Sequence, residues 1–177
     1  MAKILLLYST TDGHTLTISQ RLRQVIEAHG HEVRLLAIDA AGAIDLAAFD
    51  KIVIGARIRY GRHSPLVIDF VRRHRAALES RPCGFFSVSV VARKPNRNTP
   101  QTNPYLQKFL RITAWRPRYQ AVFAGRIAYP SYGRLDRMII RLIMWITHGP
   151  TKPDAVVEFT DWQAVEAFGR AIAGDAA

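Results

Sequence analysis

The chain has 177 residues, of which 49% are hydrophobic, which describes an ordinary globular domain and excludes a disordered chain. Its formal net charge of +11 favours an anionic partner such as nucleic acid, anionic lipid or a polycarboxylate substrate, unless the excess reflects only a genome that prefers arginine. The single cysteine, Cys83, excludes an internal disulfide bond and a Cys-x-x-Cys metal site.

Short apolar runs alternate with longer segments of helical periodicity along the chain. Strands are predicted at 3–8, 32–38, 51–56, 83–91 and 119–125, with a short late strand at 154–159. Helices are predicted at about 13–29, at 65–79, at the end of the polar loop 92–115, and at about 161–173. This order predicts an α/β fold, an open parallel five-stranded sheet with helices on both faces, in a single domain over residues 1–177.

A helical insertion is expected at about 131–148, between the fifth strand and the late one. Arg134, Arg137 and Arg141 share one stripe of this helix, and its broad apolar face includes Trp145. Such a helix could lie on an anionic membrane surface or simply pack against the domain. No apolar run approaches the roughly 18 residues that a spanning helix needs. The N-terminus also lacks the regions of a cleaved signal, so a cytoplasmic protein, peripheral on the inner membrane, is expected.

The first predicted strand ends in a polar loop at 9–15. Ligands of open α/β sheets bind beyond the carboxyl ends of the strands, and the start of a helix offers free N–H groups to an anion. Because no lysine follows Gly13 and no GxGxxG pattern is present, the loop suits one phosphate monoester rather than a nucleotide triphosphate. A serine- and threonine-rich cap and turn would have the same composition. We expect Asp12 to turn away from the phosphate and to accept N–H groups of the first helical turn, as an N-cap does.

The loop also resembles a known signature. The FMN-binding signature of flavodoxins is T-x-T-G-x-T, and Thr10, Gly13 and Thr15 fall on its matching positions, whereas Asp12 replaces the middle threonine. Nearly the whole chain resembles the bacterial menaquinone-dependent protoporphyrinogen oxidases, which are flavodoxin-like, in the segments YSTTDGHT, VIGARIRYGRHSP, SVVARKPNRNTPQTN, AWRPR, RLDRMIIRLIMW and TDW. The resemblance implies a flavodoxin-like fold with FMN as cofactor.

A flavodoxin-like site has three loops, one for the phosphate and two beside the isoalloxazine ring. Tyr60 offers an aromatic face for stacking, although it could equally pack the loop, and Gly61 lets the backbone approach closely. The cofactor-binding residues that the resemblance implies are Thr10, Thr11, Asp12, Gly13, His14, Thr15, Ile58, Arg59, Tyr60, Gly61, Ser87, Val88, Ser89, Val91, Ala92 and Arg93.

The second and third loops are rich in cations. A cationic rim suits a substrate with several carboxylates, because arginine pairs with carboxylate through two parallel hydrogen bonds, although a merely solvated basic surface is the alternative. The substrate-binding residues expected on this basis are Arg57, Arg59, Arg93, Lys94 and Arg97.

The resemblance implies FMN-dependent oxidation of protoporphyrinogen IX to protoporphyrin IX in haem biosynthesis, with electrons passed to a membrane quinone, menaquinone or ubiquinone. A flavodoxin-like NAD(P)H:quinone reductase and a non-enzymatic flavodoxin-type electron carrier are the alternatives. No nucleic-acid-binding module and no metal-ligand spacing is recognisable, and no side chain is singled out as a catalytic acid or base. The oligomeric state is left open.

Overall fold

The computed structural model describes residues 1–42, 44–146 and 148–174, so the expected domain 1–177 and insertion 131–148 each include positions outside the described residues. The main sheet has the strand order β2-β1-β3-β5-β6, and every neighbouring pair in this order is parallel. The strands are β1 (Lys3–Ser9), β2 (Glu32–Ala37), β3 (Lys51–Arg59), β5 (Cys83–Ser89) and β6 (Tyr119–Ala124). A short antiparallel strand, β4 (Arg62–His63), pairs with β3. The predicted parallel sheet is confirmed.

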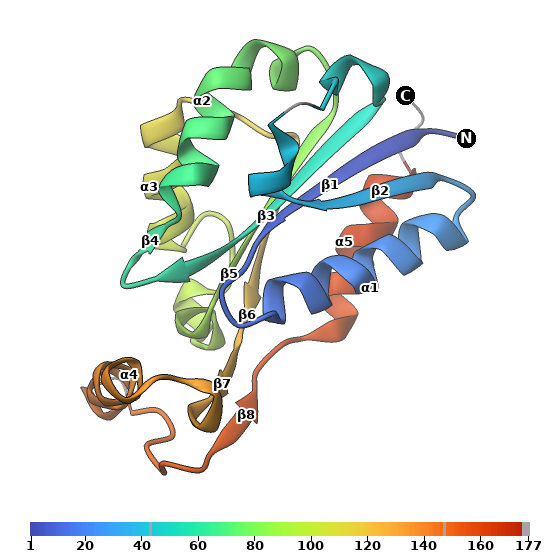
Figure 1. Cartoon of the computed structure of the whole chain (residues 1–177). Helices are drawn as coiled ribbons and strands as arrows, with labels where there is room; N and C mark the ends of the chain where they lie inside the picture. The colour runs from blue at the N-terminus through green and yellow to red at the C-terminus, as the bar shows by residue number, and fades with distance from the viewer. Residues whose placement is uncertain (43, 147, 175–177) are drawn as a thin grey trace.

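Helices cover both faces of this sheet (Figure 1). On one face α1 (His14–Ala28) and α5 (Trp162–Gly174) pack against Ile4 and Leu6 of β1, and on the other α2 (Pro65–Glu79) and α3 (Pro104–Thr113) pack against Leu5 and Leu7. Because successive side chains of a strand point to opposite faces, a strand buried on both must be apolar throughout. That is why residues 4–7 of β1 form a continuous apolar run, whereas Lys3 at the start of the strand is exposed.

The strand order reverses beside β1, whose neighbours are β2 on one side and β3 on the other. Such a switch point leaves a crevice at the carboxyl ends of the strands, where the connections diverge to opposite faces. Short 3-10 helices line the connections, at Ile38–Ala41, Leu46–Ala48, Val90–Arg93, Pro95–Arg97 and Tyr129–Ser131.

The segment between β6 and α5 stands apart from the main sheet. It contains β7 (Arg126–Ala128), α4 (Arg134–Ile146) and β8 (Val156–Glu158), and β7 and β8 form their own antiparallel pair. The late strand predicted at 154–159 is therefore present as β8, outside the main sheet. A small core of Ile127, Tyr129 and Met144 holds the segment together. Figure 1 shows it beyond the carboxyl ends of the sheet strands, with α4 beside the loops that follow β3 and β5.

Candidate functional site

The three expected loops meet around one cavity of about 300 Å³. The β1–α1 loop contributes Thr11 and Asp12, the end of β3 with its turn contributes residues 57–61, and the end of β5 contributes residues 89–91. The opposite wall is the inner face of α4, with Ile140, Ile143 and Met144. The wall formed by the three loops is thus polar and cationic, whereas the wall formed by α4 is apolar, and this combination suits a flat aromatic ligand.

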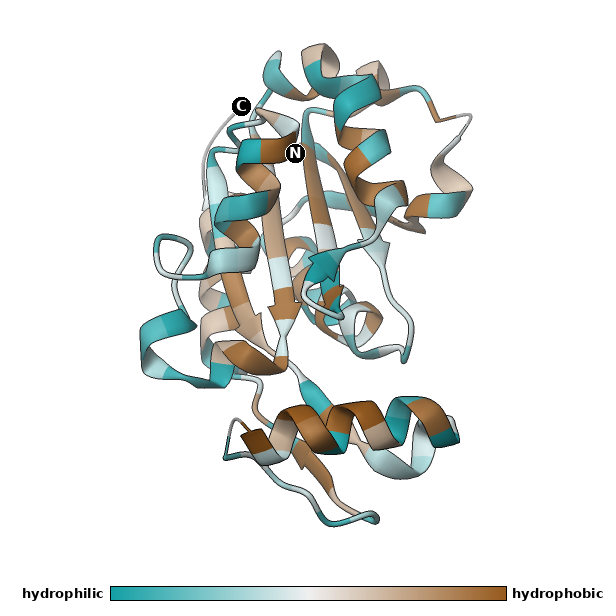
Figure 2. Ribbon diagram, turned by 90° about the vertical axis from the view of Figure 1, so that its left-hand side faces the viewer, coloured by the Kyte–Doolittle hydropathy of each residue, from teal (hydrophilic) through white to brown (hydrophobic). Residues whose placement is uncertain are grey.

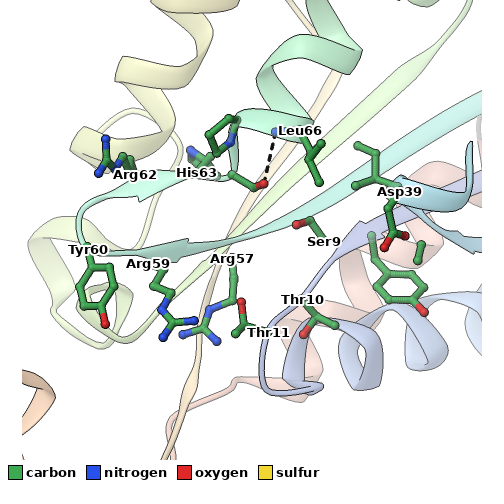
Figure 3. Close-up of a pocket in the computed structure, with 15 residues that line it drawn as sticks. Ser9, Thr10, Thr11, Asp39, Arg57, Arg59, Tyr60, Arg62, His63 and Leu66 are labelled. Carbon is green, nitrogen blue, oxygen red and sulfur yellow. Dashed lines mark hydrogen bonds between the residues drawn. The ribbon is translucent and has the colours of Figure 1, made fainter. Parts of the chain in front are cut away.

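A second cavity of about 500 Å³ adjoins the first and shares Thr11, Arg57, Arg59 and Tyr60 with it. Figure 3 shows this cavity, in which Arg57 and Arg59 point to one side of the β3–β4 ribbon while Arg62 and His63 lie on the other. The third loop does not line it. The site where all three loops converge is therefore the smaller cavity beneath α4.

A tight turn presents the second loop. Ile58 pairs with His63 and Arg59 with Arg62, so that Tyr60 and Gly61 form a two-residue hairpin turn. Both turn residues have positive φ, 50° and 75°, as in a type I′ turn. The glycine adopts such a φ without strain, and the tyrosine is half-exposed at the rim.

The Arg59 and Tyr60 side chains are both bound to Asp136 of α4. An Arg59 Nη2 to Asp136 Oδ2 ion pair spans 2.5 Å, and the Tyr60 hydroxyl donates to the other carboxylate oxygen. The Tyr60 hydrogen bond, followed by that from Arg59, lowers the pKa of Asp136, and the contacts of Arg59 with Tyr60 and then with Asp136 raise the pKa of Arg59. Arg59 and Tyr60, which were expected at the cofactor or the substrate, thus hold α4 against the cavity through Asp136.

The expected N-cap role of Asp12 is met only in part. Its Oδ1 accepts from the His14 backbone N–H at 3.4 Å, but the residue at the N-cap position of α1 is Gly13, with φ 83°. The stronger partner is Arg57, whose Nη1 lies 3.1 Å from Oδ2. The carboxylate therefore neutralises an arginine that comes from β3.

Two buried hydroxyls at the site lack a hydrogen-bond partner among the described residues. Thr15 Oγ1, on a residue 1% exposed, lies in the first turn of α1, and Ser89 Oγ, on a residue 6% exposed, lies at the end of β5. Both residues line a small cavity of about 30 Å³ beside the start of α1. A buried hydroxyl without a hydrogen-bond partner lowers the stability of the fold by about 1–3 kcal/mol. A ligand that hydrogen-bonds to Thr15 and Ser89 would remove this penalty.

His14 has a structural partner instead. The Thr160 hydroxyl donates to the Ala124 carbonyl at 2.8 Å, so it accepts from His14 Nε2, 2.7 Å away. This fixes the imidazole hydrogen on Nε2. Burial lowers the pKa of His14, which favours the uncharged form of the ring. His14 thereby links the phosphate loop to the chain that precedes α5.

Several expected residues lie elsewhere. Ser87 is buried in β5 and bonds to His63 Nε2 at 2.9 Å, and burial lowers the pKa of His63 to about 3. Arg93 donates to the Val90 carbonyl and stacks over Phe159 rather than facing either large cavity. The expected residues that line none of the three cavities are Gly13, Ser87, Ala92, Arg93, Lys94 and Arg97, whereas His14, Thr15 and Val88 line only the smallest.

Sequence reasoning missed two charged residues of the site, Arg126 and Asp136. Arg126 lines both the 300 Å³ and the 30 Å³ cavities. It follows the carboxyl end of β6, so the rule that located the other loops could have found it. Asp136 is the single acidic residue in 134–146, a segment that otherwise consists of arginines and apolar residues. This feature of the sequence could have marked it as a candidate site residue.

Comparisons with known proteins agree with this geometry. Residues 5–154 match the flavodoxin domain family. Protoporphyrinogen IX dehydrogenase (quinone) from Escherichia coli K12 is 41% identical over 97% of this chain and 94% of its own length, and that from Leishmania major is 41% identical over 94% and 72%. A Streptococcus pneumoniae TIGR4 flavodoxin has the same fold, with a TM-score of 0.54 at 12% identity over 98% of this chain and 99% of that one. The resemblance drawn from the sequence is confirmed: the chain belongs to the flavodoxin domain family and, within it, to the protoporphyrinogen IX dehydrogenase (quinone) family.

Proposed function

We propose that this protein oxidises protoporphyrinogen IX to protoporphyrin IX with FMN as cofactor, in haem biosynthesis, and passes the electrons to a membrane quinone, menaquinone or ubiquinone. The observation that carries the proposal is the 41% identity, over nearly the full chain, to relatives with that name. The reaction removes six electrons from the macrocycle, as three two-electron oxidations.

The residues present fit FMN. The first turn of α1 and the unpartnered Thr15 and Ser89 hydroxyls offer donors to a phosphate, and the cavity between the three loops lies beside them. When bound, the flavin supplies the two-electron redox chemistry, accepting hydride from a substrate carbon and passing electrons on to the quinone. The protein orients the reactants and excludes water. We propose the ring-side contacts at 58–61 and 89–91, and the phosphate contacts at 10–15.

The cationic rim is proposed to hold the substrate carboxylates. Arg57 and Arg59 line both large cavities, and Arg62 lines the larger one without an ion pair to any described residue. Since Arg57 and Arg59 are already paired with Asp12 and Asp136, a substrate carboxylate would take one of them over from its internal acid. Lys94 and Arg97 remain proposed contacts farther along the third loop.

The outer face of α4 is proposed to rest on an anionic membrane surface, where a lipid-soluble quinone is found. Its exposed apolar side chains include Met138, Leu142 and Trp145, the last 72% exposed. In Figure 2, α4 is the mostly brown, and therefore hydrophobic, helix below the sheet. Arg134 and Arg141 flank this face, and the chain carries +11 overall. No helix among the described residues is long and apolar enough to cross a bilayer. We also propose that the helical segment at about 131–148, which contains α4, is an insertion into one flavodoxin-like domain.

Vesicle binding tests the membrane surface. Phosphatidylglycerol vesicles should bind the wild type, phosphatidylcholine vesicles should not, and Leu142→Gln should reduce binding. Leu66→Gln is the matched control, because Leu66 on α2 is 58% exposed against 56% for Leu142. Equal binding of both variants would argue against α4 as the docking face.

An anaerobic redox titration tests the reaction. The purified protein should be yellow, protoporphyrinogen IX should bleach it, and menaquinone should restore the colour. Arg59→Ala should weaken porphyrinogen binding and retain FMN, whereas the control Arg34→Ala, on the edge strand β2, should change neither. Bleaching by NADPH but not by protoporphyrinogen IX would favour a quinone reductase, and bleaching by neither would favour an electron carrier. Either result overturns the proposal.

A further inference from the structure

Arg126 is a cation beside the start of α1, and its side chain has no ion-pair partner in the part of the chain that the structure describes. It is the first residue of β7, and it lines both the 300 Å³ cavity and the 30 Å³ cavity beside α1. The guanidinium makes no hydrogen bond or ion pair with any residue that the structure describes. Glu158 is its cross-strand neighbour in the β7–β8 pair, yet the two side chains form no ion pair. Its charge is therefore available to a ligand.

Two hydroxyls at the 30 Å³ cavity can donate to an anion, and the one acid that lines it, Asp12, is paired with Arg57 at 3.1 Å. The Thr15 and Ser89 hydroxyls are buried and lack partners among the described residues. The first turn of α1 adds backbone N–H groups that no carbonyl of the helix can accept. Two buried hydroxyls, a helix start and a guanidinium together specify an anion with several oxygens.

The neighbouring charges do not compete with Arg126 for this role. Arg57 is the second guanidinium at this cavity, but it is held by Asp12 at 3.1 Å. Burial lowers the pKa of His14, Glu158 raises it to a lesser extent, and Arg126 adds to the lowering. The phosphate loop itself, residues 9–15, contains no lysine or arginine. The positive charge that faces the phosphate position thus comes from β7, more than 100 residues later in the sequence.

We propose that the Arg126 guanidinium binds the phosphate of FMN, together with the Thr15 and Ser89 hydroxyls, and that it makes this site select FMN over riboflavin. The inference rests on the proposed function, since it assumes that the ligand is FMN. The two cavities share Arg126 and Ser89, so a phosphate held at their junction is continuous with a ring in the larger cavity.

Flavin binding to the apoprotein of the full chain tests this directly. Quenching of flavin fluorescence gives dissociation constants for FMN and for riboflavin, which lacks the phosphate. Arg126→Gln should weaken FMN binding about tenfold or more, the scale of one charge-assisted hydrogen bond, and leave riboflavin binding within about twofold. Arg126→Lys keeps the charge and should retain most of the FMN affinity. The control Arg34→Gln removes the same charge from the exposed middle of β2 and should change neither constant.

The salt dependence of FMN binding gives a second comparison of the wild type with Arg126→Gln. Added salt should weaken FMN binding more steeply in the wild type than in Arg126→Gln, because ions screen a guanidinium–phosphate pair. Unchanged FMN affinity in Arg126→Gln overturns the inference, and so does an equal loss for FMN and riboflavin. In both cases FMN binding by the wild type would leave the proposed function standing. A wild type that binds neither flavin would defeat the proposed function itself.

Discussion

Replacing Thr15 by valine should have opposite effects on the apoprotein and on cofactor binding. The Thr15 hydroxyl is buried, with 1% of the residue exposed, and has no partner among the described residues. Valine has nearly the same shape and is also β-branched, so the packing of α1 changes little. What changes is the hydroxyl.

The two magnitudes follow from this environment. Removing an unpartnered buried hydroxyl relieves a penalty of about 1–3 kcal/mol, so the apoprotein should gain about 1 kcal/mol or more in its free energy of unfolding. For a chain of this size each kcal/mol raises Tm by about 2–4 °C. FMN binding loses one hydrogen bond to a charged phosphate, about 1.5–3 kcal/mol, which corresponds to about 10- to 150-fold weaker binding.

Thermal unfolding of the apoprotein and fluorescence titration with FMN measure the two effects on one variant. Thr17→Val is the matched control, because Thr17 lies on the exposed side of the same helix and its hydroxyl donates to the Gly13 carbonyl at 3.2 Å. That variant should bind FMN as the wild type does. A less stable Thr15→Val apoprotein, or one that binds FMN as tightly as the wild type, would refute the assignment of this hydroxyl to the phosphate.

Three further predictions concern the charged groups and His63. Asp12→Asn should bind FMN at least as tightly as the wild type, because it removes a negative charge and releases Arg57; weaker FMN binding in fluorescence titration would contradict this. Asp136→Asn should speed amide hydrogen exchange in α4, since it breaks the ion pair to Arg59, and unchanged exchange would mean that this pair does not hold the helix. Burial lowers the pKa of His63 to about 3 while the unfolded value stays near about 6.5, so the stability it contributes is complete above about pH 6.5 and is lost as the pH falls toward 3. Urea unfolding should show a slope of up to about 1.4 kcal/mol per pH unit in that window, which His63→Gln should abolish.

The sheet and its helices were predictable because their signal is local. Residues 4–7 are apolar at every position because both faces of β1 are buried there, and the apolar stripe of α1 recurs at helical spacing. The rule that ligands bind beyond the carboxyl ends of parallel strands then pointed to the loops after β1, β3 and β5. The structure confirms that these three loops converge.

The partners within the site were less predictable. The sequence pattern predicted that Arg59 and Tyr60 contact ligands, and the structure adds that both bind Asp136, which lies 77 and 76 residues away along the chain, respectively. Ser87 was expected at the cofactor from its place near a strand end, and in the structure its hydroxyl is hydrogen-bonded to His63. Local sequence pattern does not tell which distant side chain a residue contacts.

The α/β architecture and the family could be predicted from the sequence alone, because they depend on periodicity and on contiguous motifs. The distribution of charges at the site became visible only in the tertiary structure. Arg57 pairs with Asp12, Asp136 binds the hairpin turn to α4, and Arg126 of β7 lines the cavity beside the start of α1. These contacts join segments that are far apart in the chain and meet only when the sheet gathers its carboxyl ends at one edge. Asp12 is an acid in a loop that contains no lysine or arginine, and its ion-pair partner, Arg57, comes from β3.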